Sequence, residues 1–285
     1  MIRSELEDAL SELRRILADA ITTATYNGEV SPNGQAAKNA AIRSSTPIQK
    51  VHQVVQRSIY DELISLGLTA DIWPPIGRTS PELKVSGLLK SKDQDVAVTV
   101  DPHVREVLSS GVMAGTIDPV GFHATNRALV VGVRSQLSSV EKNFDTLAER
   151  AFAETLNLRL RCPDITLGEV YLLPLNEFDD AALKTNRVGF KRNKINLLKF
   201  AKFFNAITES SIGANPAEIY EYNATALIVS DFSSPQVRIL WTPEEVEAEF
   251  DKITADAVSP ILPSQFTKRI SEHYDNKINP SSAKD

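Results

Sequence analysis

Three short stretches of this sequence gather side chains that can do phosphate chemistry. Asp95 heads a run of small apolar residues, and Lys92 lies three residues before it. Arg134 directly follows the apolar run 128–133 and precedes a cluster of polar residues that includes Ser135, Gln136, Lys142 and Asn143. The third stretch, 184–202, holds seven Lys or Arg residues and no acid. A carboxylate at a strand end can bind a hard metal ion, and arginine can hold a phosphate with two parallel hydrogen bonds.

A mixed set of helices and strands must position these side chains. Apolar positions spaced by three or four predict helices over 3–26, 47–66 and 194–208, and one from Ser138 or Ser139 to about 158. Short apolar runs predict strands over 83–89, 96–100, 128–133, 165–173, 224–230 and 236–241. We also expect a short helix over 103–109, and a capping box at Thr242–Glu245 that starts an acidic helix to about 257.

This order of elements predicts an α/β or α+β chain with a single mixed central sheet flanked by helices. We divide the chain into an N-terminal helix and loop over 1–46, a core over 47–260, and a C-terminal tail over 261–285. The tail is polar beyond His273 and is expected to fray.

The composition excludes several classes of protein. The 285 residues are 42% hydrophobic and 24% charged, which is typical of a soluble globular protein. No apolar run is long enough to span a membrane, and the opening MIRSELEDAL lacks the apolar stretch of a secretory signal. The single cysteine, Cys162, favours a reducing cytoplasm, and the four dispersed histidines offer no zinc signature.

The charge is unevenly distributed. A net charge of −6 argues against a general nucleic-acid coat. The basic stretch 184–202 nevertheless offers a polyanion a local docking site, and we expect Lys191, Arg192 and Lys194 to contact DNA phosphates.

The order of elements over 47–175 resembles the core of PD-(D/E)XK nucleases, and the phrase VRSQLSSVEKNFDTL resembles type II restriction endonucleases in particular. The resemblance implies a restriction-endonuclease-like core and Mg²⁺-dependent hydrolysis of double-stranded DNA at a specific sequence. It also implies a homodimer, with a heteromer as the alternative. Asp95 would be the family's first metal ligand, and Gln136, Lys142 and Asn143 would contact DNA.

The sequence departs from that family where a Glu-x-Lys pair should stand, because it has Gly132-Val133-Arg134 instead. Glycine cannot ligate a metal, and the pKa of arginine is too high for a base. Some restriction enzymes carry the glutamate in the following helix, where Glu149 stands, with Glu141 as the competitor. The expected site is therefore Asp95 and Glu149 on the metal, with Arg134 and Lys92 as the catalytic cations.

Structural interpretations of the same residues stay open. Asp95 can be a turn residue, Glu149 a solvated helix residue, and 184–202 the solvated face of a helix. Glu169, inside an apolar strand, is either a site carboxylate or a buried partner of Arg134 or Arg150, and we favour the structural role.

Two further functions are alternatives to the nuclease. The missing Glu-x-Lys pair favours a non-catalytic DNA-binding protein, or one subunit of a heteromer, on a decayed nuclease fold. An unrelated α/β enzyme on a phosphorylated substrate is the weaker alternative, since the sequence has no glycine-rich phosphate loop.

Overall fold

A mixed six-stranded sheet forms the centre of the molecule, in a computed structural model that describes residues 1–44, 46–209 and 218–280. Its strands, in spatial order, are β14 (Arg238–Ile239), β13 (Ala224–Asp231), β10 (Thr166–Pro174), β9 (Leu129–Ser135), β6 (Val96–Thr99) and β3 (Asp71–Trp73). β9, β10 and β13 are parallel, and the other three strands pair antiparallel with their neighbours. The predicted single mixed sheet flanked by helices is confirmed.

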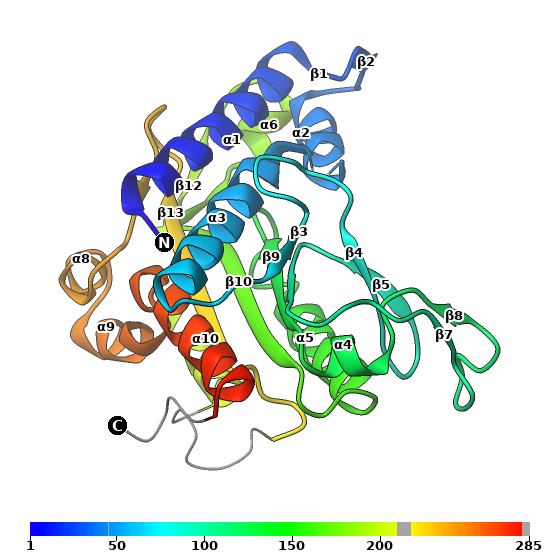
Figure 1. The fold of residues 1–285 in the computed structure, drawn as a ribbon. Coiled ribbons are helices and arrows are strands. Elements are labelled where there is room, and N and C mark those ends of the chain that lie inside the picture. The colour runs from blue at the N-terminus through cyan, green and yellow to red at the C-terminus, as the bar shows by residue number, and fades with distance from the viewer. Residues whose placement is uncertain (45, 210–217, 281–285) are drawn as a thin grey trace.

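Long amphipathic helices cover one face of this sheet (Figure 1). They are α1 (Arg3–Thr23), α2 (Gly34–Arg43), α3 (Gln49–Ser65) and α10 (Pro263–Ile278). Leu6, Val55 and Ile270 from these helices pack with Val131 and Val170 of the sheet. Their burial explains why the apolar spacing predicts α1 and α3 so well.

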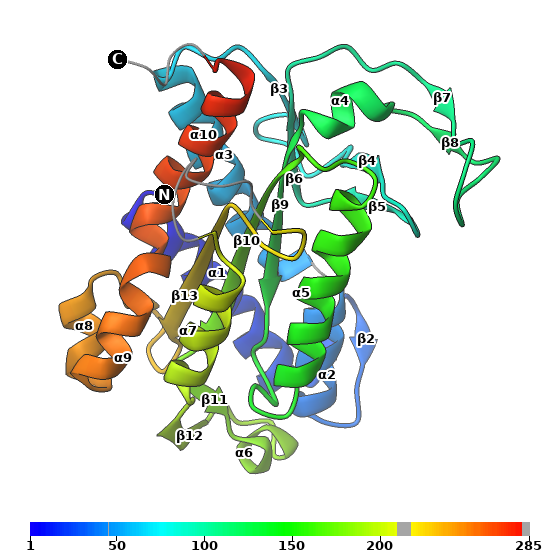
Figure 2. The same cartoon turned by 90° about the horizontal axis from the view of Figure 1, so that it is seen from below.

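The other face is covered by α5 (Phe144–Arg159) and α7 (Leu197–Ala206), which Figure 2 shows beside the strands. Leu147 and Phe200 pack there with Val130, Leu167 and Tyr171. Successive residues of β9 and β10 therefore alternate between the two faces, as strand geometry requires. The short helices α8 (Pro243–Glu249) and α9 (Lys252–Val258) contribute Val246 and Val258 to this half of the core.

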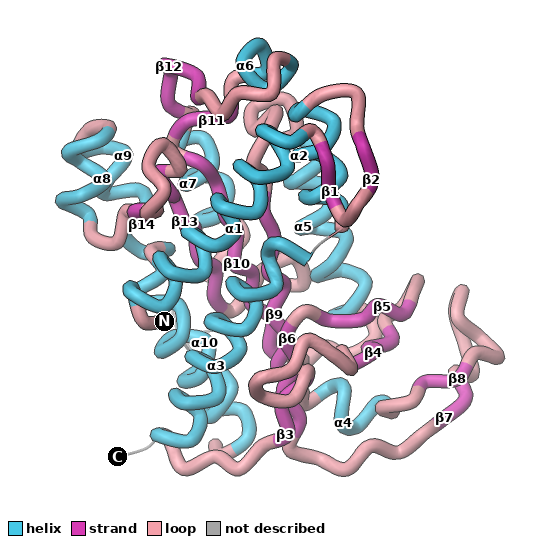
Figure 3. Tube along the Cα trace, turned by 90° about the horizontal axis from the view of Figure 1, so that it is seen from above, coloured by secondary structure: helices cyan, strands magenta, loops and turns pink. Residues whose placement is uncertain are grey.

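In the described part of the chain, four two-stranded hairpins surround the sheet, and Figure 3 shows β4–β5 and β7–β8 extending from the body of the molecule. They are β1–β2 (Thr25–Tyr26, Glu29–Val30), β4–β5 (Leu83–Ser86, Ser91–Gln94), β7–β8 (Glu106–Val107, Ile117–Asp118) and β11–β12 (Asn176–Phe178, Phe190–Lys194). Single short helices are α4 (Phe122–Asn126) and α6 (Asp180–Lys184).

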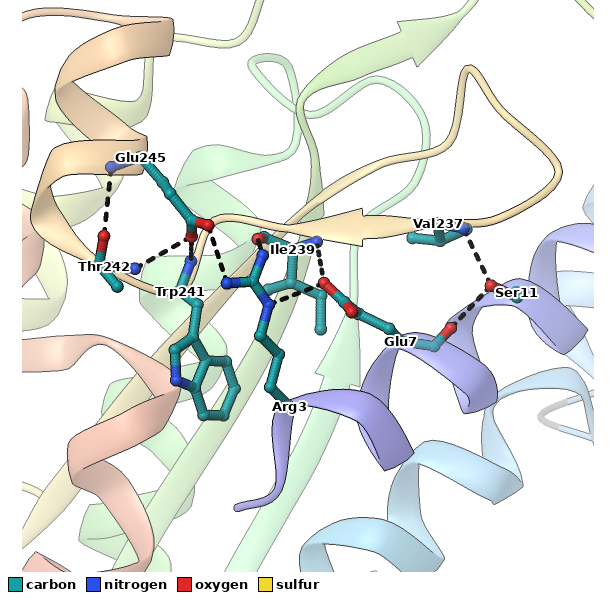
Figure 4. Close-up of polar contacts among 8 residues, drawn as sticks. All are labelled: Arg3, Glu7, Ser11, Val237, Ile239, Trp241, Thr242 and Glu245. Carbon is teal, nitrogen blue, oxygen red and sulfur yellow. Dashed lines mark hydrogen bonds and ion pairs between the residues drawn. The ribbon is translucent and has the colours of Figure 1, made fainter.

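The N-terminal helix α1 covers the edge of the sheet at β14 (Figure 4). Glu7 accepts a hydrogen bond from the Ile239 N–H (3.2 Å), and Ser11 accepts one from the Val237 N–H (2.9 Å). Arg3 pairs with Glu7 (3.0 Å) and Glu245 (2.8 Å) and donates to the Ile239 carbonyl. These side-chain contacts occupy backbone groups at the β14 edge. An unpaired strand edge can otherwise pair with another chain.

The predicted capping box is confirmed: Thr242 accepts from the Glu245 N–H, and Glu245 accepts from the Thr242 N–H. The acidic helix predicted to run to 257 is instead two helices, because Asp251 caps a new one by accepting from the Thr254 N–H (2.7 Å). The predicted helix start at Ser138 or Ser139 is wrong, since Ser139 has a φ of +52° and α5 begins after Asn143.

Two further predictions differ from the structure. The helix expected over 103–109 is an extended segment with β7, because Glu106 and Asp118 face each other across a hairpin and both pair with Arg161. The tail expected over 261–285 begins with α10, whose Phe266 and Tyr274 are buried against the sheet. Residues 281–285 lie outside the described residues. None of the described helices is long and apolar enough to cross a membrane.

Candidate functional site

Three adjacent strands place Asp95, Gly132 and Glu169 at one level of the sheet. Glu169 of β10 is in register with Gly132 of β9, and Val96 of β6 is in register with Val131. Asp95, one residue before β6, therefore lies opposite Gly132. Residues two positions away on each strand, Ala97, Val130 and Leu167, all pack on the α5 side, so Asp95 and Glu169 share that face.

Glycine in the middle strand makes room for the Glu169 carboxylate. A Cβ atom at position 132 would lie 2.4 Å from Glu169 Oε2, far inside van der Waals contact. The carboxylate therefore occupies the space where the side chain of residue 132 would stand.

Each of the two carboxylates is held by one oxygen and leaves the other unused. Asp95 Oδ2 accepts a hydrogen bond from the Val133 N–H (2.8 Å), and Glu169 Oε1 pairs with Arg134 Nε (2.7 Å). Asp95 Oδ1 and Glu169 Oε2 have no hydrogen bond or ion pair to another described residue. Two anchored carboxylates with free oxygens thus flank the Gly132–Val133 peptide.

A chain of ion pairs links these groups to α5. Lys92 Nζ lies 3.0 Å from Glu154 Oε1, and Arg134 lies 3.3 Å from Glu154 Oε2. Burial would raise the pKa of Glu154, but Lys92 and Arg134 outweigh it and hold that pKa below the ordinary value. Arg134 thus bridges Glu154 and Glu169, and the Glu169 charge raises the pKa of the Arg134 guanidinium.

Burial dominates at Glu169, whose side chain is only 3% exposed. It raises the pKa of Glu169 to about 7, against the opposing pull of Arg134 and Lys92. Glu169 can therefore gain or lose a proton near neutral pH, a behaviour that is concentrated at functional sites.

A cavity of about 560 Å³ opens beside these residues, between α3, α5 and the ends of β9 and β10. Asp95, Lys92, Arg134 and Glu169 all line it. From α3 comes His52, whose pKa is lowered by burial although Asp95 acts in the opposite direction. Glu82 also lines the cavity, and burial together with Asp95 and Asp93 raises its pKa.

The structure brings some of the predicted site residues together and places others elsewhere. Asp95, Arg134 and Lys92 converge, and Gln136 and Asn143 line the same cavity. Glu149 is exposed on α5 and is not among the lining residues. Glu154 does not line the cavity either, but it is the α5 carboxylate that contacts the site, through its ion pairs with Lys92 and Arg134. Glu149 lies five residues earlier, about 140° around the helix. The predicted Asp95–Glu149 metal pair therefore has no support in this geometry.

The remaining predicted residues lie elsewhere. Glu141, the competitor of Glu149, accepts a hydrogen bond from the Asn196 N–H (2.7 Å), and Lys142 is exposed outside the cavity lining. Figures 2 and 3 both show β12, which carries Lys191, Arg192 and Lys194, away from the β5–β6 junction.

Acids from distant parts of the chain offset much of the charge of this basic strand. Lys191 pairs with Glu177 (2.6 Å), and Lys194 pairs with Glu249 (2.8 Å). Arg192 is exposed, and no ion pair joins it to another described residue. A role of this strand in DNA binding stays a prediction.

Sequence reasoning missed several residues of the site, among them His52, Arg78, Arg150 and Glu154. Arg78 and Arg150 are exposed and line the cavity, so they lie at its mouth. Neither has an ion pair to another described residue. One signal was available for α3, where polar residues recur at helical spacing opposite the apolar stripe: Gln49, His52, Gln53 and Gln56. No local pattern marks Glu154 among the other acids of α5.

The donor set suits a hard divalent cation. Across the part of the chain that the structure describes, no three His, Cys, Asp or Glu side chains are grouped closely enough to hold a metal ion. Mg²⁺ is usually bound by one or two carboxylates together with water and substrate oxygens. The free oxygens of Asp95 and Glu169, from the two strands that neighbour Gly132, fit that requirement.

Comparison with known proteins adds no relative. No family model, curated protein or solved structure matches the chain with significance.

Proposed function

We propose that this chain is a Mg²⁺-dependent endonuclease that hydrolyses phosphodiester bonds in double-stranded DNA, of the restriction type that the sequence resembles. The observation that carries the proposal is the placement of Asp95 and Glu169 on either side of Gly132, each with one free oxygen, in the wall of a cavity. Carboxylates with free oxygens, together with water and substrate oxygens, can hold the ion that a metal-dependent phosphodiesterase needs.

Each residue then has a distinct role. Asp95 and Glu169 would hold the ion, which when bound lowers the pKa of a water and stabilises charge on the phosphate. Arg134 is a positioning residue, because its contacts to Glu154 and Glu169 fix the Glu169 carboxylate. Lys92 lines the cavity and is held by Glu154, so its ammonium can donate to a phosphate oxygen or to the attacking water.

The unpaired arginines at the cavity mouth support a polyanionic substrate. Arg78 and Arg150 are exposed, and neither pairs with an acid among the described residues. Guanidinium groups bind phosphates with good geometry, and each contact adds to the salt dependence of DNA binding.

If the chain were a decayed nuclease, no carboxylates would be expected to gather where the family has its metal site. Gly132 and Glu169 instead form a complementary pair, in which the loss of a side chain on one strand accommodates a carboxylate from the next. This complementarity supports an active site over a vestigial one.

The test compares three carboxylate variants in a plasmid nicking assay with Mg²⁺ and with EDTA. Asp95→Asn and Glu169→Gln should each lower the rate by at least about 100-fold, since a lost metal ligand costs several kcal/mol of transition-state stabilisation. Glu149→Gln is the matched control and should cut like the wild type. Activity that survives Glu169→Gln but is lost in Glu149→Gln would refute this site. No Mg²⁺-dependent cleavage by the wild type would refute the function.

A further inference from the structure

Helix α3 turns a polar face toward the cavity. Gln49, His52, Gln53 and Gln56 follow the spacing of one helix face and line the cavity, while Val51 and Val55 pack into the core on the other side. A helix packed beside a sheet normally fills such space with apolar side chains. The polar face therefore indicates a ligand with hydrogen-bonding groups.

Several of these polar groups are unused. The side chains of Gln49, Gln53 and Asn143 have no hydrogen bond to another described residue, whereas Gln56 donates to the Pro74 carbonyl. His52 Nε2 is buried without a partner among the described residues. Buried polar groups are nearly always satisfied in native proteins, so this ring nitrogen requires a partner such as a ligand or a water. The side chains of Gln49, Gln53 and Asn143 are only half-buried, so they are open to a ligand in the cavity. Side-chain amides carry both a donor and an acceptor and can pair with the edge of a nucleobase.

The size of the cavity limits what can enter it. A volume of about 560 Å³ corresponds to a sphere about 10 Å across, and the major groove of DNA alone is about 12 Å wide. Pockets of roughly 300–1,000 Å³ hold single drug-sized molecules. A single nucleotide fits, and a paired duplex does not. Ile48, Pro74 and Tyr171 supply apolar wall for the face of a base.

The catalytic carboxylates belong to the same wall. Glu169 is nearly fully buried, so a phosphate reaches its free oxygen only from inside the cavity. The exposed Arg78 and Arg150 lie where the adjoining phosphates would leave it. Cleavage at these carboxylates would therefore require one strand to depart from the duplex.

We infer that the cavity binds one unpaired nucleotide next to the scissile phosphate, with its base against the amides of Gln49, Gln53 and Asn143. This inference rests on the proposed nuclease function and names its substrate class: DNA in which one nucleotide is unpaired or has been turned out of the stack. Extruding a paired base costs a few kcal/mol, and a nucleotide that is already unpaired avoids this cost.

The test uses two short duplexes with one central 2-aminopurine nucleotide, which is paired with thymine in one duplex and left unpaired in the other. Binding is measured in EDTA by fluorescence anisotropy, so that no strand is cut. The duplex with the unpaired nucleotide should bind the wild type at least about tenfold more tightly, which is about 1.4 kcal/mol. The double variant Gln49→Leu, Gln53→Leu should lose that preference and keep its affinity for the fully paired duplex. Gln265→Leu, on the exposed side of α10 and outside the cavity lining, is the matched control and should keep the preference.

Equal binding of the two duplexes by the wild type would overturn the inference, and so would a preference that the double variant retains. Addition of Mg²⁺ then tests the nuclease separately. A protein that prefers the unpaired nucleotide but cuts neither these duplexes nor plasmid DNA with Mg²⁺ would refute the nuclease and leave the nucleotide pocket standing. A protein that cuts both duplexes equally and binds them equally would refute the nucleotide pocket and leave the nuclease standing.

Discussion

Replacing Gly132 by alanine should displace the Glu169 carboxylate and inactivate the protein. The added Cβ would lie 2.4 Å from Glu169 Oε2, whereas ordinary contact begins at 3.4 Å. One of the two groups must therefore move by about 1 Å. The backbone at position 132 is held in the middle of the sheet, so the carboxylate moves, and its 2.7 Å contact with Arg134 is strained.

The structure sets the magnitude of two effects. Forcing a methyl group into a packed site costs about 1–3 kcal/mol of unfolding free energy. A misplacement of about 1 Å in a catalytic group costs about 100-fold in rate. We therefore expect Gly132→Ala to lower both the stability and the Mg²⁺-dependent nicking rate by these amounts.

A second background separates this contact from a general effect of alanine. The three atoms nearest to a methyl group at position 132 belong to Glu169 and Arg134, and the Arg134 atom lies at an ordinary 3.6 Å. In a Glu169→Ala protein, the methyl group added at position 132 meets no close atom. Replacing glycine by alanine within a strand then adds about 0.5–1 kcal/mol to the free energy of unfolding. The sign of the effect should thus reverse between the two backgrounds.

Urea unfolding followed by circular dichroism measures all four proteins of this cycle. An equal loss of stability from Gly132→Ala in both backgrounds would refute the direct contact between residue 132 and Glu169. If Gly132→Ala nicks plasmid DNA as fast as the wild type, the position of the Glu169 carboxylate has no role in catalysis.

Two further predictions concern stability. Burial raises the pKa of Glu169 to about 7, so the folded wild type should lose stability as the pH rises from about 4.5 through 7. Glu169→Gln mimics the neutral acid and should therefore be more stable than the wild type in EDTA at pH 8. The gain should reach up to about 3 kcal/mol, at 1.36 kcal/mol per pKa unit, and should shrink toward pH 5. Thermal unfolding of both proteins between pH 5 and 8 measures this difference, and a difference that does not change with pH would refute the pKa shift. Glu7→Ala removes the acceptor of the Ile239 N–H at the sheet edge and should cost about 1–3 kcal/mol in urea unfolding. Asp8→Ala, exposed on the same helix, should cost almost nothing, and equal losses in the two variants would contradict the role of α1 as an edge cover.

Local patterns in the sequence determined much of the fold. The apolar spacing over 3–26 and 47–66 predicts the helices observed as α1 and α3, and the continuous apolar run at 165–173 predicts the buried strand β10. The capping box at Thr242 is a relation between residues three positions apart. Such features depend on contacts within a turn or a strand, so the sequence by itself is sufficient to find them.

The candidate site was only half predictable for the same reason. Asp95 and Arg134 stand at strand ends, which a local pattern marks. The sequence favours Glu169 as a buried partner of Arg134 or Arg150, and the 2.7 Å ion pair with Arg134 is present. Its position above Gly132 depends on the register between β9 and β10, which are joined by a long crossover through α5.

Tertiary structure alone decided which acids and bases meet. The helical phase of α5, set by its packing against the sheet, turns Glu154 toward Lys92 and Arg134 and leaves Glu149 in solvent. Glu177 of β11 pairs with Lys191, and Glu249 of α8 pairs with Lys194. These acids lie outside the basic stretch, so they offset charges that the linear sequence shows as unbalanced. Electrostatic contacts act over a few ångströms in space whatever the separation along the chain, so only the folded arrangement determines which charges are paired and which remain free to bind a ligand.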